Sequence, residues 1–285
     1  MKKIAVTGLS GEVGCSLKSE LSILTDSIID LSHQRFNLLE PNGFSTVLED
    51  SKPDILIHLA GITHIDTCEA DRENGKLGPV WQTNVIATAK IAEECFKKKI
   101  HLIYLSTECV FDGKEQSFLE SDETHPINWY GVTKAEAEKA IVSSDCSFTI
   151  LRAVIGYSAQ GKKTLWQKIE KKIANDTEIV MANDHWMTPT YLPDISKAVK
   201  ICVEENRRGS FHLTPNVAIT PFTFAQKVAE GLGYSKEMIQ PAALAEIIGE
   251  KKAKLRLKHA CLNSKYTEQE LHLTFKNISS AIKEL

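Results

Sequence analysis

The chain has 285 residues, of which 42% are hydrophobic and 25% are charged, and its formal net charge is −3. This balance gives no electrostatic reason to expect nucleic acid or a membrane surface as a partner. No apolar run approaches the ~18 residues of a membrane span, and the first one ends at Gly8, too early for a signal peptide. Seven scattered cysteines without a CxxC pair indicate reduced thiols, and nine histidines show no HExxH spacing. We therefore expect a cytoplasmic protein without a metal centre.

The first half of the chain alternates apolar, strand-like runs with helical segments. Expected strands cover 3–8, 27–30, 54–61, 101–107 and 147–156, and expected helices cover 12–24, 43–50, 81–98 and the segment after Asn128. Continuous apolar runs separated by helices predict a parallel sheet that is buried on both faces. The predicted fold class is therefore α/β, with a Rossmann-type doubly wound parallel sheet.

The alternation loosens after residue 156. Shorter strands are expected at 177–181 and 209–213, helices at 162–174, 195–206 and 221–232, and prolines break this half into short elements. We predict a dinucleotide-binding domain over 1–155, with 189–206 packing back on it. The rest, 156–285, is predicted to be mainly a smaller, partly interleaved substrate-binding region.

The stretch "TGLSGEVG" (7–14) lies where the first strand meets the first helix. Gly8 suits a tight turn, Gly11 lets the backbone approach a pyrophosphate, and Gly14 permits close packing of the helix. The free amides and the positive end of the helix then face the phosphates. This pattern, placed within a βαβ unit, predicts a dinucleotide site.

Asp30 ends the second expected strand, where an acidic residue can bond an adenosine ribose hydroxyl. A strand-end aspartate that starts a turn is the alternative interpretation. His33 and Arg35 follow and could instead neutralise a 2′-phosphate. The sequence leaves the choice between NADH and NADPH open.

Tyr130 and Lys134 are four residues apart on an expected amphipathic helix, so the phenol and the ammonium share one face. Val132, Ala137 and Ile141 are the candidates for its packed side. Upstream, Ser106 and Thr107 end a strand. A free phenol has a pKa of about 10, which a neighbouring ammonium and a positive nicotinamide ring would lower. We predict that Tyr130 gives a proton to a carbonyl oxygen, that Thr107 holds that oxygen, and that Lys134 holds the nicotinamide ribose.

On these motifs the chain resembles the extended short-chain dehydrogenase/reductases, and within them the dTDP-4-dehydrorhamnose reductase branch. "LAGITHIDTCE" (59–69) is similar to that family's A-A-x-T-x-V-D-x-x-E, and "STECVFDG" (106–113) is similar to S-T-D-Y-V-F-D-G. "PINWYGVTKAEAE" (126–138) is similar to P-x-N-x-Y-G-x-[ST]-K-x-x-x-E. "NDHWMTPTYLPDIS" (183–196), "GSFHLT" (209–214) and the spacing of Arg256 and Leu262 extend the resemblance over nearly the whole chain.

The resemblance implies a role for each matching position. The implied catalytic residues are Thr107, Tyr130 and Lys134. The implied cofactor contacts, besides Tyr130 and Lys134, are Gly8, Ser10, Gly11, Glu12, Val13, Gly14, Asp30, Asn37, Leu38, Ala60, Gly61, Thr63 and Asn84. The implied substrate contacts are Thr107, Glu108, Cys109, Ile155, Trp186 and Arg256.

The departures from the family pattern gather at the substrate end. Glu108-Cys109 stands for the family's Asp-Tyr, and Ile155 for its Trp. His185 and Met187 replace a Gln and a Gly, and Leu257 replaces the Pro after the late arginine. Loss of a Tyr and a Trp removes two flat faces that could pack on a sugar ring. We therefore expect an altered sugar pocket beside an intact cofactor and proton-transfer site.

The resemblance implies an NAD(P)H-dependent oxidoreductase that reduces a 4-keto-6-deoxy sugar nucleotide in surface-polysaccharide biosynthesis. Two alternatives remain: an epimerase or dehydratase of the same superfamily, or a non-catalytic dinucleotide-binding subunit like methionine adenosyltransferase beta. The expected cofactor is NADP or NAD. Some family members use a divalent ion, but the sequence offers no support for Mg²⁺. The expected partner is a nucleotide sugar, and a homodimer is the assembly considered.

Overall fold

The structure is a computed structural model that describes residues 2–25, 27–32, 37–40, 43–159, 164–175 and 178–284. His33 and Arg35, considered above for a 2′-phosphate, lie outside the described residues. Within the described ranges, no helix is both long and apolar enough to cross a membrane.

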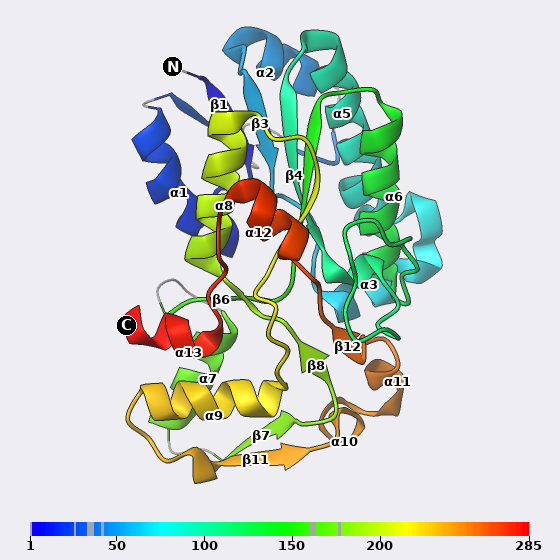
Figure 1. The fold of residues 1–285 in the computed structure, drawn as a ribbon. Coiled ribbons are helices and arrows are strands. Elements are labelled where there is room, and N and C mark those ends of the chain that lie inside the picture. The colour runs from blue at the N-terminus through cyan, green and yellow to red at the C-terminus, as the bar shows by residue number, and fades with distance from the viewer. Residues whose placement is uncertain are drawn as a thin grey trace.

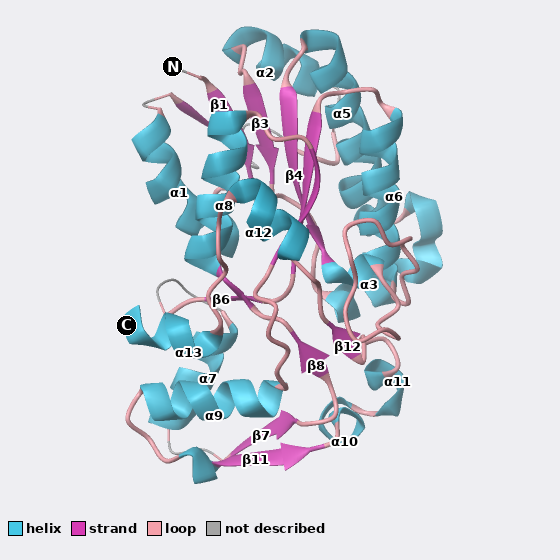
Figure 2. Cartoon of the chain, in the orientation of Figure 1, coloured by secondary structure: helices cyan, strands magenta, loops and turns pink. Residues whose placement is uncertain are grey.

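A six-stranded parallel sheet forms the upper part of the molecule in the view of Figure 2, with strand order β10-β5-β4-β3-β1-β2. Its strands are β1 (Ile4–Thr7), β2 (Ile28–Leu31), β3 (Ile55–His58), β4 (His101–Thr107), β5 (Phe148–Ala153) and β10 (Gly209–Leu213). The predicted doubly wound fold is confirmed. The expected strands at 101–107 and 209–213 have the predicted bounds, because continuous apolar runs are what a sheet covered on both faces requires.

Helices cover both faces of the sheet (Figure 1). On one face lie α1 (Glu12–Leu24), α8 (Leu192–Glu205) and α12 (Lys265–Leu271), whose apolar side chains join one buried cluster with β1 and β3. On the other face lie α2 (Phe44–Ser51), α5 (Ala87–Lys98) and α6 (Trp129–Ser143) in a second cluster. The sheet is therefore closed to water on both sides.

The expected helix over 81–98 is interrupted. A short α4 (Pro79–Trp81) passes through a π-helical turn (Gln82–Ile86) before α5 begins. Another helix, α3 (Ile65–Asp71), was not expected, because its seven residues are too few for a clear apolar period. It lies beside α6 at the carboxyl end of the sheet (Figure 1).

The region below the sheet consists of short strand pairs and helices around a third apolar cluster (Figure 1). The pairs are β6 (Gly156–Tyr157) with β9 (Thr190–Tyr191), β7 (Ile179–Ala182) with β11 (Ile239–Ala242), and β8 (Trp186–Met187) with β12 (His259–Ala260). The helices are α7 (Leu165–Ala174), α9 (Pro221–Gly231), α10 (Leu244–Ile248), α11 (Glu250–Ala253) and α13 (Ile278–Ala281). Because α8, β10 and α12 return to the sheet, the two parts of the fold exchange segments along the chain.

Helix α6 is not the amphipathic helix that was expected. Ala137 and Ile141 are buried as predicted, but Val132 is only partly buried. Tyr130, Lys134 and Glu138 are buried as well, on the side that meets the sheet and the lower region. The helix therefore buries polar groups one turn apart, and each of them needs a partner.

Glu138 finds its partner in Arg152 of β5. Two hydrogen bonds join them, Nε to Oε1 at 3.1 Å and Nη2 to Oε2 at 2.7 Å. Both side chains are only 7% exposed. Arg152 Nη1 also donates to the carbonyl of Glu120, and its guanidinium lies over the ring of Phe111. This bidentate pair joins α6 to strand β5 of the sheet.

Removing one half of this pair should destabilise the fold strongly. Arg152→Met leaves the Glu138 carboxylate buried without a cation, at a cost of about 3–5 kcal/mol. The measurement is the free energy of unfolding in urea. Lys139→Met is the matched control, since its ion pair with Glu136 is exposed and contributes at most about 1 kcal/mol. Equal losses in both variants would contradict a structural role for the buried pair.

Candidate active site

The glycine turn leaves the end of β1 in a conformation that a side chain would not tolerate. Gly8 has φ +74°, and a Cβ there would lie 2.8 Å from the backbone nitrogen of Ala60, after β3. Gly11 donates its N–H to the carbonyl of Gly8 at 3.0 Å and forms the N-cap of α1 without a side-chain cap. The first amides of α1 are therefore free to bind an anion.

Gly14 holds α1 against this turn. A Cβ on Gly14 would lie 2.5 Å from the carbonyl oxygen of Gly8 and 2.6 Å from the backbone of Leu9. Ser10 and Glu12 are exposed beside the turn, and Val13 is partly buried. The residues expected at the phosphates thus surround one open cradle of backbone amides.

The residues expected at the adenosine end lie on the edge strand β2 and in the segment that follows it. Asp30 is exposed and stands opposite Val6 in the parallel register, close to the glycine turn. Asn37 turns inward on its own loop, where its side-chain oxygen accepts the N–H of Leu39 at 3.0 Å. Leu38 packs against the second apolar cluster. Among the residues that the structure describes, Asp30 is therefore the one of these three whose side chain has no hydrogen-bond partner and could meet a ribose hydroxyl.

Ala60, Gly61 and Thr63 follow β3 and reach the middle of the same edge, and the side chain of Asn84 braces this loop. Its Oδ1 accepts the N–H of Ile62 at 2.8 Å, and its Nδ2 donates to the Ile62 carbonyl at 2.9 Å and to Thr133 Oγ1 at 3.0 Å. Asn84 is only 3% exposed. The direct cofactor contact expected for Asn84 has no support in this geometry, which gives it a positioning role between the loop and α6.

The start of α6 is pressed against the turn that follows β4. Asn128 caps the helix by accepting the N–H of Gly131 at 2.8 Å. A Cβ on Gly131 would lie 2.0 Å from the carbonyl oxygen of Cys109, so only glycine allows this approach. The contact brings Tyr130 to the end of β4, within hydrogen-bonding reach of Thr107.

Lys134 lies one turn further along α6, beneath Tyr104. Its Nζ donates to the carbonyl of Leu105 at 2.7 Å and lies 3.9 Å from the centre of the Tyr104 ring. Burial lowers the pKa of Lys134 to about 7, and the carboxylate of Glu138 only partly opposes this. Lys134 is therefore not a permanent cation beside Tyr130 in the protein by itself.

Burial also raises the pKa of the Tyr130 phenol well above its ordinary value. The neighbouring Cys109, Glu108 and Tyr104 act in the same direction, and only the Thr107 hydroxyl opposes them. The sequence predicted a lowered pKa from the neighbouring charges. It could not predict the opposing effect of desolvation, because the Tyr–Lys spacing does not show how deeply the phenol is buried. In the protein by itself Tyr130 keeps its proton at neutral pH, as a proton donor must.

Comparison with known proteins places this site in a family. The family described as RmlD substrate binding domain matches residues 1–285. A dTDP-4-dehydrorhamnose reductase of Sinorhizobium fredii is 30% identical over 234 residues, which cover 79% of this chain and 77% of that protein. The chain belongs to this family. Methionine adenosyltransferase 2 subunit beta of Pongo abelii, 25% identical over 270 residues (87% of this chain and 77% of that protein), is another relative.

Solved structures agree on the fold. A dTDP-4-dehydrorhamnose reductase of Bacillus anthracis in complex with NADP superposes with a TM-score of 0.90 at 21% identity, covering 99% of this chain and 98% of that one. The UDP-glucose 4-epimerase of Thermus thermophilus with NAD gives a TM-score of 0.82 at 16% identity, covering 99% and 96%. The predicted class, an NAD(P)-dependent oxidoreductase of sugar-nucleotide metabolism, is thus confirmed at the level of the RmlD family.

The residues expected at the substrate end are dispersed. Glu108 and Cys109 lie beside Thr107 and Tyr130, and Ile155 follows β5 with 44% of its surface exposed. Arg256 is engaged elsewhere: its Nη2 contacts Asp66 Oδ1 of α3 at 2.6 Å. The pKa of Asp66 is lowered to about 2, mainly by a hydrogen bond from Lys252 and next by one from Arg256. In this member of the RmlD family the late arginine links the lower region to α3.

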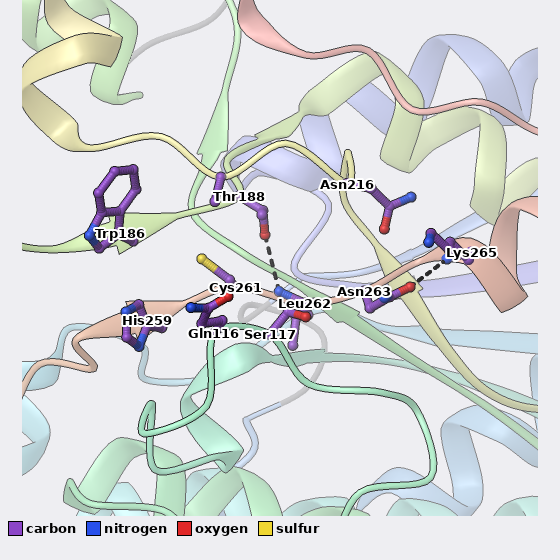
Figure 3. Close-up of a pocket in the computed structure, with 11 residues that line it drawn as sticks. Gln116, Ser117, Trp186, Thr188, Asn216, His259, Cys261, Leu262, Asn263 and Lys265 are labelled. Atoms are coloured by element: carbon purple, nitrogen blue, oxygen red, sulfur yellow. Dashed lines mark hydrogen bonds between the residues drawn. The ribbon is translucent and has the colours of Figure 1, made fainter.

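A cavity of about 560 Å³ opens beside β8 and β12 (Figure 3). Trp186 and His259 stand at one end of it and Asn216 and Lys265 at the other, while Thr188 accepts the N–H of Leu262 between them. Trp186 is the one predicted substrate contact that lines it. The sequence did not indicate Gln116, Ser117, Asn216, Asn263 or Lys265, because they come from separate loops without a common motif.

All seven cysteines are free thiols. Among the residues that the structure describes, no group of three or more His, Cys, Asp or Glu side chains is arranged to hold a metal ion. Cys109 is buried, and burial raises the pKa of its thiol, which makes it a wall of the site.

Gly14→Ala tests the cradle. The added methyl would meet the Gly8 carbonyl at 2.5 Å, so the turn or α1 must shift, at a cost of about 1–3 kcal/mol. We expect the affinity for NADPH to fall about tenfold or more, as followed by its fluorescence. Gly43→Ala is the control, because a Cβ there meets nothing within 4 Å and its φ of −79° suits any residue. Unchanged NADPH binding in Gly14→Ala would exclude this turn as the cofactor site.

The lowered pKa of Lys134 predicts a pH dependence of stability. The folded protein releases this proton near pH 7, whereas the unfolded chain keeps it up to about 10.5. The contribution of Lys134 to the free energy of unfolding therefore rises with pH between these values, by up to about 1.4 kcal/mol per unit, and is lost as pH falls through 7. Urea unfolding of the protein and of Lys134→Met at several pH values should give a difference with this slope. A difference that stays constant with pH would show that Lys134 titrates normally.

Proposed function

We propose that this protein reduces the ketone of a 4-keto-6-deoxy sugar nucleotide with NADH or NADPH. The observation that carries the proposal is the meeting of Thr107, Tyr130 and the glycine turn at the carboxyl edge of one parallel sheet. Ligands of open α/β sheets bind at this edge. Membership of the RmlD family, and a relative named dTDP-4-dehydrorhamnose reductase, support the substrate class.

The chain's own residues fit a dinucleotide. At Gly8, Gly11 and Gly14 an added Cβ would meet neighbouring backbone, and the turn they form would let a pyrophosphate lie against the free amides at the start of α1. Asp30 would take a ribose hydroxyl at the adenosine end. When bound, the nicotinamide supplies the hydride for the ketone carbon. Solved proteins of this fold hold NADP or NAD, so both forms belong in the test.

Tyr130 would supply the proton. Its phenol is neutral in the folded protein and stands next to Thr107, so a ketone oxygen placed between the two hydroxyls could receive a hydrogen bond from each. Lys134 would have two roles. Its amino group, with a pKa near 7, would hold a ribose hydroxyl, and in its charged form it would stabilise the phenolate of Tyr130 that forms when the proton is given up. Asn84 and Gly131 fix the position of α6, and with it the position of Tyr130 relative to Thr107.

A second function, that of a non-catalytic subunit, is favoured by one observation. The relative from Pongo abelii is named as subunit beta of methionine adenosyltransferase 2, and it matches 87% of this chain. The altered substrate end agrees with such a role. Substrate-dependent oxidation of NAD(P)H by the purified protein separates the two functions, because a subunit would need its partner enzyme.

Tyr130→Phe should keep the cofactor but lower turnover. Loss of the proton donor is expected to reduce kcat by about 10²–10⁴-fold. The measurement is absorbance of the reduced nicotinamide with NADH or NADPH and a panel of 4-keto-6-deoxy sugar nucleotides that starts with dTDP-4-dehydrorhamnose. Tyr234→Phe, at an exposed tyrosine after α9, is the control.

Two outcomes would count against the proposal. Near-normal turnover in Tyr130→Phe would remove the phenol from the mechanism. A protein that binds NADPH tightly but oxidises it with no member of the panel would favour the subunit role. The homodimer and the cytoplasmic location remain predictions.

A further inference from the structure

The proton of the Thr107 hydroxyl is already committed in the folded protein. It donates its only proton to Oε2 of Glu108 at 2.7 Å. It accepts the backbone N–H of Cys109 at 3.2 Å, as the N-cap of the short turn Glu108–Val110. A threonine hydroxyl has one proton and two acceptor positions. In this arrangement Thr107 has no proton left for a substrate oxygen.

The proposed reduction needs that proton. A ketone oxygen that gains negative charge is stabilised only by groups that donate hydrogen bonds to it. The Thr107 proton can turn to the substrate only if Glu108 no longer accepts it. This happens when the Glu108 carboxyl carries a proton of its own, because its O–H can then donate to the free acceptor position of Thr107 Oγ1.

The surroundings of Glu108 favour this neutral form. The titratable groups that face it are Cys109 on its own turn, Tyr130 on α6 and Cys261 after β12, and each is neutral at pH 7. Among the described residues, no lysine or arginine forms an ion pair with it or contributes to its titration. The carboxyl is partly buried, and this desolvation raises its pKa above the ordinary value.

We propose that Glu108 is a positioning residue that must be neutral for turnover, because its O–H then donates to Thr107 and releases the Thr107 proton to the substrate oxygen. The proposal rests on the proposed reductase function. Ionised Glu108 takes the Thr107 proton back, so turnover falls as the pH rises through the pKa of Glu108. A carboxyl that only supported the fold would not place an inflection in the rate.

The test is the dependence of kcat on pH for the full-length protein and two variants, with NADPH and the best substrate of the panel. Glu108→Ala removes the group that accepts the Thr107 proton, so nothing competes with the substrate oxygen for it and the alkaline inflection assigned to Glu108 should disappear. Glu108→Gln offers an amide N–H at every pH. It should keep kcat close to the maximal kcat of the unmodified protein and should also lack the alkaline inflection assigned to Glu108. Thr107→Val in each background should abolish the difference between Glu and Gln.

A direct measurement of the protonation state accompanies the kinetics. The infrared spectrum of the protein minus that of Glu108→Gln should contain the band of a neutral carboxyl at the pH of maximal rate. Absence of this band, or an unchanged inflection in Glu108→Gln, would overturn the proposal while the reductase stands. Failure of the unmodified protein to reduce any ketone would overturn the reductase function itself, and the role of Glu108 with it.

Discussion

The close contact between the start of α6 and the turn after β4 is the constraint on which the candidate site depends. Gly131 lies so near the carbonyl of Cys109 that no side chain fits between them. This contact sets Tyr130 beside Thr107, two residues that the chain separates by a long loop. The pair Arg152–Glu138 anchors the same helix to β5, and Asn84 anchors it to the loop after β3. Three independent attachments thus determine where the phenol stands.

Desolvation decides the chemistry of the groups that meet there. Burial removes water from Tyr130 and Lys134 of α6 and from Glu108 in the turn after β4, so the neutral form of each of these three groups is favoured. Tyr130 and Glu108 shift toward keeping their protons, and Lys134 shifts toward losing its own. A site built in this way holds proton donors ready at neutral pH without a fixed charge of its own. A charge at this site would then be supplied by the bound cofactor or substrate.

The residues at the substrate end differ from those that the family resemblance suggests, although the fold around them is the same. Arg256, expected to contact substrate, pairs with Asp66 and joins the lower region to α3. Leu257 and Met187, where the family resemblance suggests Pro and Gly, are buried in the apolar cluster that also holds Tyr130. The cavity beside Trp186 lies next to β8 and β12 and is lined by both polar and apolar side chains from four segments of the chain. The cofactor end, in contrast, keeps every glycine that the backbone geometry requires.

The sequence by itself determined the parallel sheet, the glycine cradle and the order of Thr107, Tyr130 and Lys134. These are properties of short stretches: apolar runs, turn residues and helical spacing act over a few residues, and the carboxyl ends of parallel strands always share an edge. Only the tertiary structure decided that β10 completes the sheet, that Asn84 braces a loop, and that the Glu108 carboxyl contacts the Thr107 hydroxyl. It alone also showed that burial raises the pKa of Tyr130 and lowers that of Lys134 in the protein by itself. Burial depends on side chains from distant parts of the chain, and no local pattern records how much water they exclude.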